Sequence, residues 1–323
     1  NLMRQCRKYS PDLILLNHRL GLTKSKPYAT TFLFGGAETY IDVHMTNTMT
    51  APHHRAQALS RRLVPGLQRL TEDHGVCLSS CLDYWEDDLI LQAFNRSLIL
   101  APEIYGNPWL LRDDEFSRLA RIYNLHRKYR DILIKGKTLP ESYGPYAVSR
   151  GDKNTQIVTL RNLGWTAKSY SIKLDEEIGI ETDEELTVVQ LHPSEKILGT
   201  YKKGETINVD VQPFRAFMLV ATTEKYDEPA VEGANFNVIK NVPEQDIEMQ
   251  ILGMPGTQTS ISLLNSEAYK SAKINGKELP ELVQGKKLKL TFPDLSMADK
   301  SKTFELAFFT PLPVLLTMVL RLC

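Results

Sequence analysis

Residues 98–134, LILAPEIYGNPWLLRDDEFSRLARIYNLHRKYRDILI, contain the pattern that decides the fold. An apolar run, Leu98–Ala101, leads into the polar stretch Pro102–Asn107, and a helical stretch follows over residues 114–134. That stretch has apolar residues at helical spacing and acidic residues in its first turn, where they complement the helix dipole. Lys135–Lys137 ends it. An apolar strand, a polar strand end and a helix together predict a βα unit of a parallel sheet.

The same unit recurs three times towards the N-terminus. Apolar runs at Leu13–Leu16, Thr39–Val43 and Val76–Ser79 are each followed by polar residues. Helical patterns follow the second and the third of these runs, over residues 54–70 and 87–97. Four βα units predict an α/β part whose strands are covered by helices. Residues 1–10 predict the last turns of a further helix, with basic residues near its C-terminal end.

Beyond Pro140 the pattern changes to short strands separated by turn residues, which is typical of β-sandwiches. We expect the strands of a first sandwich at residues 146–148, 156–161, 169–174, 186–191, 207–211 and 216–221. A second β-rich part has expected strands at 247–252, 260–264, 271–274, 287–292 and 303–309, and a hairpin turn at Asn275-Gly276. Residues 310–323 are an apolar run broken by two prolines and too short to span a bilayer. We interpret them as a truncated or non-native tail.

Composition excludes several classes of function. The 323 residues include 39 Lys and Arg and 39 Asp and Glu, so the basic excess typical of nucleic-acid-binding proteins is absent. No segment of the sequence predicts a membrane span. Of the four cysteines only Cys77 and Cys81 are near each other, which does not complete a tetrahedral zinc site, and we expect no metal and no cofactor. The oligomeric state stays open.

Polar side chains gather where the expected strands end. Ligands of parallel sheets and barrels bind at the carboxyl ends of the strands, so we expect the site there. Hydrolysis of a glycosidic bond uses two carboxyl groups, and planar aromatic rings cover the apolar face of a sugar. The strand ends supply these types, together with further polar groups, as Asn17, His18, Arg19, Asp42, His44, Asp83, Trp85, Glu86 and Glu103.

The order of these stretches resembles a known family. PDLILLNHR (residues 11–19), TYIDVHMTN (39–47), GVCLSSCLDYWED (75–87), LILAPEIYGN (98–107), the helix LARIYNLHRKYRDIL (119–133) and YGPYAVSRGD (143–152) are similar to the C-terminal half of the melibiase-type α-glycosidase barrels, the clan of α-galactosidases. The resemblance implies a partial (β/α)8 TIM barrel, strands 5–8, in residues 1–138. It implies a β-sandwich domain in residues 139–228 and a second, sandwich-like domain in residues 229–309, before the tail 310–323.

The resemblance also implies roles for individual residues. The family has an Asp nucleophile at the end of its fourth strand, which is expected upstream of Asn1, and an acid/base Asp at the end of its sixth. The acid/base maps onto Asp42; Glu38 is the second choice, because it would need a bulge to point into the site. The sugar would be placed by Asn17, His18, Arg19, His44, Asp83, Trp85 and Glu103. Departures from the family's motifs at Asn17–Arg19 and Ile41–Val43 indicate a divergent member.

Structural interpretations of the same residues stay open. Asp42 lies inside an apolar strand, so it is either functional or paired with a neighbour such as Arg55 or His44. Residues 17–19 fit sugar hydroxyls, but they also fit loop carbonyls at a strand end. Glu103 equally fits a salt bridge. Residues 87 and 88 fit the N-cap and first turn of the following helix.

We therefore expect a fragment of a retaining α-glycoside hydrolase that cleaves bonds in oligo- or polysaccharides, and we expect the fragment to be inactive alone. Its partner is a carbohydrate substrate, and the parent is expected to be an exported bacterial protein, periplasmic or extracellular. The alternative is a non-catalytic carbohydrate-binding or cell-surface protein with a degenerate barrel. An upstream strand that ends in Asp would favour the hydrolase.

Overall fold

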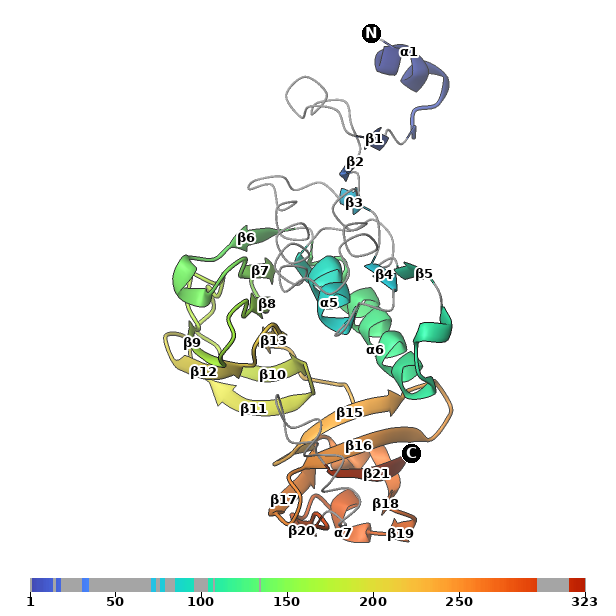
Figure 1. The fold of residues 1–323 in the computed structure, drawn as a ribbon, viewed down its shortest axis with the longest axis vertical. Coiled ribbons are helices and arrows are strands. Elements are labelled where there is room, and N and C mark those ends of the chain that lie inside the picture. The colour runs from blue at the N-terminus through green and yellow to red at the C-terminus, as the bar shows by residue number, and fades with distance from the viewer. Residues whose placement is uncertain are drawn as a thin grey trace. The chain divides into compact units, whose positions relative to one another are not determined.

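The computed structural model describes residues 2–13, 16–18, 31–34, 71–73, 76–78, 85–95, 104–106, 108–133, 135–294 and 314–322. The chain falls into two compact units, whose elements are labelled in Figure 1. The first unit comprises residues 1–112, 122–181 and 206–216, and the second comprises residues 113–121, 182–205 and 217–323. The described part is built mainly of β-strands, with few helices. The domain boundaries expected at residues 138, 228 and 309 stay predictions.

The first unit begins with a short helix and parallel strands. Helix α1 (Leu2–Tyr9) carries basic residues in its last turn, as expected. Strands β1 (Leu16–His18), β2 (Thr31–Phe34) and β3 (Thr71–Asp73) form a parallel sheet in this order. Parallel neighbours need a crossover connection, so this pairing agrees with the βα pattern of the sequence. Strands β2 and β3 were not expected, and residues 39–43 lie outside the described residues.

A second parallel pair lies in the same unit. Strand β4 (Val76–Leu78) pairs with β5 (Ile104–Gly106) in parallel, and Val76 faces Ile104 in the register. The strand expected at 76–79 is thereby confirmed. Residues 98–101 lie outside the described residues, and β5 falls in the stretch that was expected to be the polar end of that strand. These parallel pairs are compatible with a partial barrel, which stays a proposal.

Helix α5 (Trp85–Asn95) has an acidic first turn and is mainly apolar after it. Its apolar side chains with exposures of 1% or less are Leu89, Ile90, Leu91, Ala93 and Phe94. It packs against two antiparallel strands of the first unit, β7 (Val148–Gly151) and β8 (Thr155–Arg161). Both strands are buried along their whole length, and the helix accounts for one face of them, because successive side chains of a strand point to opposite faces.

The remaining strands of the first unit are antiparallel. Strand β6 (Gly136–Thr138) pairs with β7, and β9 (Lys168–Lys173) pairs with β12 (Thr206–Val211). In β9 and β12 buried and exposed residues alternate, as in a sheet with one face on the core. The strands expected at 156–161, 169–174 and 207–211 are thus confirmed. The strand expected at 146–148 begins only at Val148, because Tyr146 has a φ of 60°.

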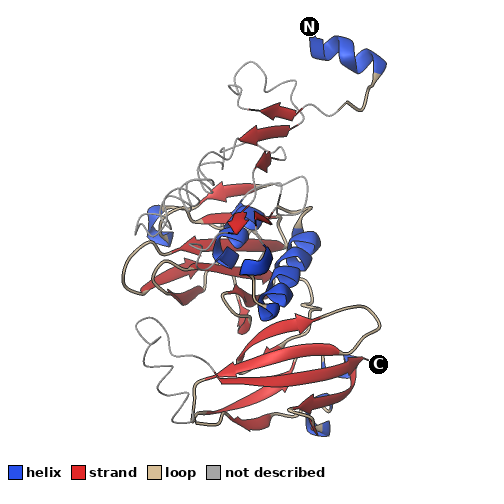
Figure 2. Cartoon of the chain, turned by 45° about the vertical axis from the view of Figure 1, so that its right-hand side comes forward, coloured by secondary structure: helices blue, strands red, loops and turns tan. Residues whose placement is uncertain are grey.

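Three sheet regions make up most of the second unit. Strand β10 (Leu186–His192) pairs with β11 (Lys196–Tyr201) and β13 (Ala216–Thr222), and β17 (Gln258–Leu263) lies between β14 (Val231–Glu232) and β20 (Leu288–Thr291). A five-stranded antiparallel sheet, drawn as neighbouring arrows in Figure 2, has the order β15 (Asn235–Lys240), β16 (Ile247–Gly253), β21 (Val314–Leu322), β18 (Tyr269–Ile274) and β19 (Lys277–Glu278). The other helical elements are η1 (Pro108–Leu110), α6 (Asp113–Tyr129), η2 (Glu141–Tyr143), η3 (Ser266–Ala268) and α7 (Pro280–Val283).

The expected hairpin at Asn275-Gly276 is confirmed. It connects β18 to β19, and the two turn residues have φ angles of 50° and 79°. Two consecutive positive φ angles are the requirement of the tight turn that joins strands with the usual twist.

Residues 310–323 were expected to be a truncated or non-native tail, and the structure places residues 314–322 of this segment within a sheet. Residues 314–322 form β21, which pairs with β16 on one side and with β18 on the other. Leu316, Met318 and Leu320 alternate with exposed or half-buried residues and are at most 6% exposed. The apolar run is therefore an inner strand of the sheet.

Candidate functional site

The structure describes few of the residues expected to bind or transform a sugar. It gives the backbone of Asn17 and His18 and the placement of Trp85. The expected acid/base Asp42, the second choice Glu38, and the expected sugar-binding residues Arg19, His44, Asp83 and Glu103 lie outside the described residues. Their roles stay predictions.

Asn17 and His18 belong to β1 itself. Asn17 is in register with Phe32, and His18 with Leu33 of the parallel neighbour β2. Of the strand expected at residues 13–16, only Leu16 belongs to β1, and residues 14 and 15 lie outside the described residues. Asn17 and His18 are part of β1 instead of following it. Both still lie at the carboxyl end of a parallel strand, where ligands of such sheets bind.

Trp85 is the first residue of α5, and its side chain is 4% exposed. The indole ring is covered by protein and packs with the buried helix. A ring covered in this way offers little area to a sugar. The expected contact of Trp85 with substrate stays a prediction.

The acidic residues after Trp85 bind arginines. Asp87 is fully buried and accepts hydrogen bonds from Arg215 Nε at 2.8 Å and from the backbone N–H of Ala216 at 3.0 Å. Arg161 lies with its Nη1 3.5 Å from Asp88 Oδ1. The expectation of acidic residues in the first helical turn is confirmed, but Asp87 is the third residue of α5 and not its N-cap. These carboxylates hold α5 against strand β8 and against the turn that contains Arg215, which identifies them as structural.

The other end of α5 is held by Arg150. Its Nε donates to the carbonyl oxygen of Asn95, the last residue of the helix, at 2.9 Å, and its Nη1 donates to Leu133 O at 2.7 Å. A guanidinium at this position complements the negative end of the helix dipole. Burial lowers the pKa of Arg150 to about 10. The side chain therefore remains charged at neutral pH.

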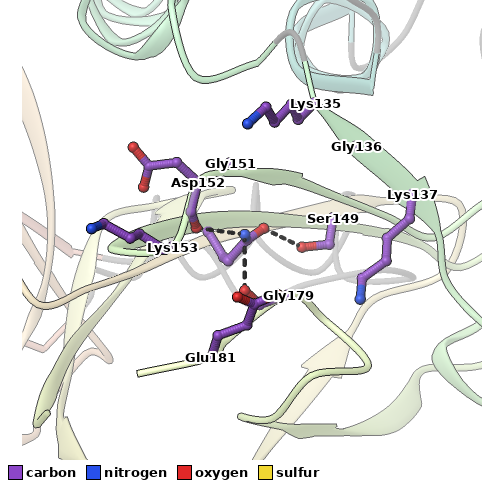
Figure 3. Close-up of a pocket in the computed structure, with 10 residues that line it drawn as sticks. Lys135, Gly136, Lys137, Ser149, Gly151, Asp152, Lys153, Gly179 and Glu181 are labelled. Carbon is purple, nitrogen blue, oxygen red and sulfur yellow. Dashed lines mark hydrogen bonds between the residues drawn. The ribbon is translucent and has the colours of Figure 1, made fainter. Parts of the chain in front are cut away.

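A pocket of 540 Å³ opens on the antiparallel part of the first unit (Figure 3). Its lining combines three lysines, two carboxylates, two buried polar side chains and three glycines: Lys135, Gly136, Lys137, Ser149, Gly151, Asp152, Lys153, Gln156, Gly179 and Glu181. The lysine and carboxylate charges add up to one positive charge at neutral pH. The pocket therefore offers ammonium groups to a hydroxylated or an anionic ligand.

Backbone groups fix the floor of the pocket. Gln156 Nε2 donates to Asp152 O at 2.7 Å and to Gly179 O at 3.2 Å, and Ser149 Oγ lies 2.5 Å from Ile178 O. A side chain at position 179 would collide with this arrangement, since a Cβ there would lie 2.6 Å from Gln156 Nε2. Gly179 also has a φ of 97°, which favours glycine.

The sequence interpretation missed this pocket. It treated residues 135–137 only as the end of the preceding helix. The signal available in the sequence was the recurrence of Lys within two residues of Gly, at Lys135-Gly136-Lys137 and again at Gly151-Asp152-Lys153. Nothing in the sequence placed the two stretches together, because β6 and β7 bring them into register through a hairpin.

Neither a metal centre nor a membrane helix is seen in the part of the chain that the structure describes. No group of three or more His, Cys, Asp or Glu side chains there is arranged to hold a metal ion. Likewise, no described helix combines the length and apolarity that crossing a membrane requires.

Comparisons with known proteins give matches among solved structures only. No protein-family model and no curated protein matches the chain. The α-galactosidase I of Mortierella vinacea is 12% identical with a TM-score of 0.40, over 62% of this chain and 56% of the enzyme. A GH27 β-L-arabinopyranosidase of Geobacillus stearothermophilus is 14% identical with a TM-score of 0.41, over 70% of this chain and 54% of the enzyme.

A third match, the isomalto-dextranase of Arthrobacter globiformis T6 complexed with panose, is 10% identical with a TM-score of 0.41. It aligns with 99% of this chain, which covers 61% of the enzyme. The chain thus spans 54% to 61% of the length of these three structures. The structural neighbours are glycoside hydrolases, and they include members of the α-galactosidase family that the sequence resembles.

Proposed function

We propose that this chain is part of a retaining α-glycoside hydrolase, similar to α-galactosidases, that cleaves glycosidic bonds in oligo- or polysaccharides. The observation that carries the proposal is the order of the elements. The parallel strands β1, β2 and β3 come first, β4 and β5 then alternate with helices α5 and α6, and mostly antiparallel strands follow in the described part of the chain. The same order underlies the resemblance found in the sequence.

In this proposal Asp42 is the general acid/base, and Glu38 is the alternative. A retaining enzyme needs a second carboxylate about 5–5.5 Å away, which forms the covalent glycosyl intermediate. We expect that nucleophile in sequence that precedes residue 1. Asn17, His18, Arg19, His44, Asp83, Trp85 and Glu103 are proposed to orient the sugar. The proposed partial barrel, strands 5–8, would bring these strand ends to one face.

The test is hydrolysis of aryl α-glycosides by the full-length gene product that contains this sequence. Asp42→Asn should lower kcat by about 100-fold or more on substrates with poor leaving groups, because proton donation contributes factors of this size. Substrates with activated leaving groups need little proton donation and should keep most of their rate. Glu38→Gln should leave the profile unchanged if Asp42 is the acid.

Asp131→Asn is the matched control, since the side chain of Asp131 is 92% exposed and forms only a surface ion pair with Arg130. Equal loss on all leaving groups would remove Asp42 from the acid role. If the protein binds glycans and cleaves none of the substrates, the non-catalytic carbohydrate-binding alternative replaces the hydrolase.

A further inference from the structure

Two aromatic side chains meet on neighbouring turns of the first unit. The ring centroids of Trp165 and Phe214 are 4.8 Å apart, and the ring planes are at 89°, so the rings pack edge to face. Trp165 nevertheless keeps 62% of its surface exposed. A large ring held in place and still open to solvent is a feature of binding surfaces.

A buried asparagine ties the two turns together. Asn162 is fully buried, and its Nδ2 donates to Thr166 O at 2.8 Å and to Val211 O at 2.9 Å. Its Oδ1 accepts the N–H of Gly164 at 2.8 Å, and its own N–H donates to Arg215 O at 3.0 Å. One residue therefore fixes, through its side chain and its backbone N–H, both the turn that carries Trp165 and the turn that carries Phe214.

Apolar packing and ion pairs hold the turns that carry Trp165 and Phe214 in place. Leu163 packs against the buried residues Leu91 of α5 and Ala216. Arg215, which follows Phe214, donates to Glu86 Oε1 at 3.0 Å and to Asp87 in the first turn of α5. The aromatic pair is thus fixed beside the start of the helix that follows β4.

The backbone at Phe214 gives an independent indication. Its φ is 60°, a conformation that costs most residues on the order of 1–3 kcal/mol and that Gly or Asn adopts more readily. Retaining Phe there places an aromatic ring against Trp165 at a cost in stability. Strain of this kind is found preferentially at binding and catalytic sites.

The size and the surroundings of the pair identify the occupant. Two side chains expose at most a few hundred Å², whereas a stable protein partner needs about 800 Å² from each side. A single sugar ring matches the smaller area, and its hydroxyls need hydrogen-bond donors at the rim. Lys168 supplies such a donor. Its Nζ lies near Gly164, the residue before Trp165, since a Cβ built on Gly164 would be 3.8 Å from it.

We propose that Trp165 and Phe214 form a carbohydrate-binding platform that stacks on the apolar face of a sugar ring, separate from the catalytic carboxylates. The choice of a sugar as ligand rests on the proposed function. The platform would hold a neighbouring unit of the polysaccharide while another unit is cleaved. Its affinity depends on rigidity, because preformed turns spare the entropy cost of ordering the rings.

The experiment measures equilibrium binding by calorimetry, with maltotriose, isomaltotriose and raffinose as probes and the full chain as the protein. Trp165→Ala should weaken binding of at least one probe by about tenfold, since it removes the stacking face. Phe214→Asn keeps the positive φ, removes the second ring and should also weaken binding. Asn162→Ala keeps both rings, unties the turns and should weaken binding without abolishing it.

Trp109→Ala is the matched control, since Trp109 is 90% exposed on η1 and should leave the affinity unchanged. Equal far-UV circular dichroism and melting temperature show that Trp165→Ala folds. The platform is refuted if no probe binds, if Trp165→Ala binds as the wild type does, or if Trp165→Ala abolishes self-association and leaves sugar binding intact. Binding needs no turnover, so failure of the hydrolase proposal in the Asp42 assay is distinguishable from failure of the platform.

Discussion

Removal of the Arg121 guanidinium should destabilise the second unit strongly. Arg121 is 4% exposed, and it donates from Nε and Nη2 to the two carboxylate oxygens of Glu195 at 2.9 and 2.7 Å. Its Nη1 donates to Glu228 Oε2 at 2.6 Å. Burial lowers the pKa of Arg121, but the carboxylates outweigh that effect and raise the pKa above its usual value. Arg121→Met keeps an unbranched side chain and deletes the charge.

The magnitude follows from the state of Glu195 after the substitution. Glu195 is fully buried, and its backbone is fixed by two hydrogen bonds of 2.8 Å with Phe236, so its carboxylate cannot reach water by a small movement. Breaking a buried pair by removing one partner costs about 3–5 kcal/mol. Glu228 is 17% exposed and can regain water, so the loss of its bond adds little. We expect about 4 kcal/mol, a large part of the ~5–15 kcal/mol that stabilises a typical domain.

The assay is urea unfolding of the full chain, followed by two signals. The three tryptophans, Trp85, Trp109 and Trp165, all belong to the first unit, so their fluorescence is the internal control. Far-UV circular dichroism reports the strands of both units, and the two signals are fitted separately because two units need not unfold as one. The part of the circular-dichroism transition that the fluorescence does not follow reports the second unit, and only this part should move to lower urea.

A double variant checks the cause. Arg121→Met with Glu195→Leu replaces the buried pair by apolar groups, which is often neutral for stability, so it should recover most of the loss. The reasoning fails if Arg121→Met lowers the free energy of unfolding by less than about 1 kcal/mol, which is the usual contribution of a surface ion pair. It also fails if the double variant is no more stable than Arg121→Met alone.

Two further predictions concern one buried group in each unit. Burial, and secondly the charge of Arg130, lowers the pKa of His126 from 6.5 to about 4, so its stabilising contribution is complete above pH 6.5 and is lost as the pH falls towards 4. His126→Phe should remove on the order of 2 kcal/mol of this acid dependence, measured as the difference in urea midpoints between pH 7 and pH 4.5; an identical dependence in both proteins would contradict it. A Cβ at Gly253 would lie 2.1 Å from the buried ring of Phe292, so Gly253→Ala should cost about 1–3 kcal/mol, and adding Phe292→Leu should restore part of the melting temperature. No recovery in that double variant would place the strain elsewhere.

The sequence was informative where one local rule decides the structure. The φ requirement of Asn275-Gly276 predicts the hairpin between β18 and β19, and the alternation in β9 and β12 predicts strands with one buried face. The apolar run of β4 likewise predicts a strand that pairs in parallel. Each of these depends on neighbours within a few residues, so a single sequence contains the necessary information.

The sequence was misleading where pairing is distant. Residues 310–323 were interpreted as a truncated or non-native tail because two prolines break the apolar run. Residues 314–322 nevertheless pair with β16 and β18, whose residues lie far away in the chain. Strand β11 was not predicted from the sequence. Gly199 interrupts its strand pattern, close to a bulge in the pairing with β10. At the candidate site, Trp85 is of a residue type that is suited to contact a sugar. Its burial follows only from the packing of α5, which the sequence does not show.

The charged residues of the two helices show why residue type alone cannot separate a site from a structural clamp. Asp87 lies on α5 and pairs with Arg215, 128 residues away, and Arg121 lies on α6 and pairs with Glu195, 74 residues away. Carboxylates in a first helical turn predict a favourable dipole interaction of less than about 1 kcal/mol. Burial of the same carboxylates makes a partner obligatory, because an unpaired buried charge costs several kcal/mol. A candidate such as Asp42, which also lies in an apolar stretch, must therefore be judged by whether a cation faces it. Comparison of Asp42→Asn with Asp87→Asn makes this distinction: loss of turnover with unchanged stability indicates a catalytic carboxylate, and loss of stability indicates a clamp.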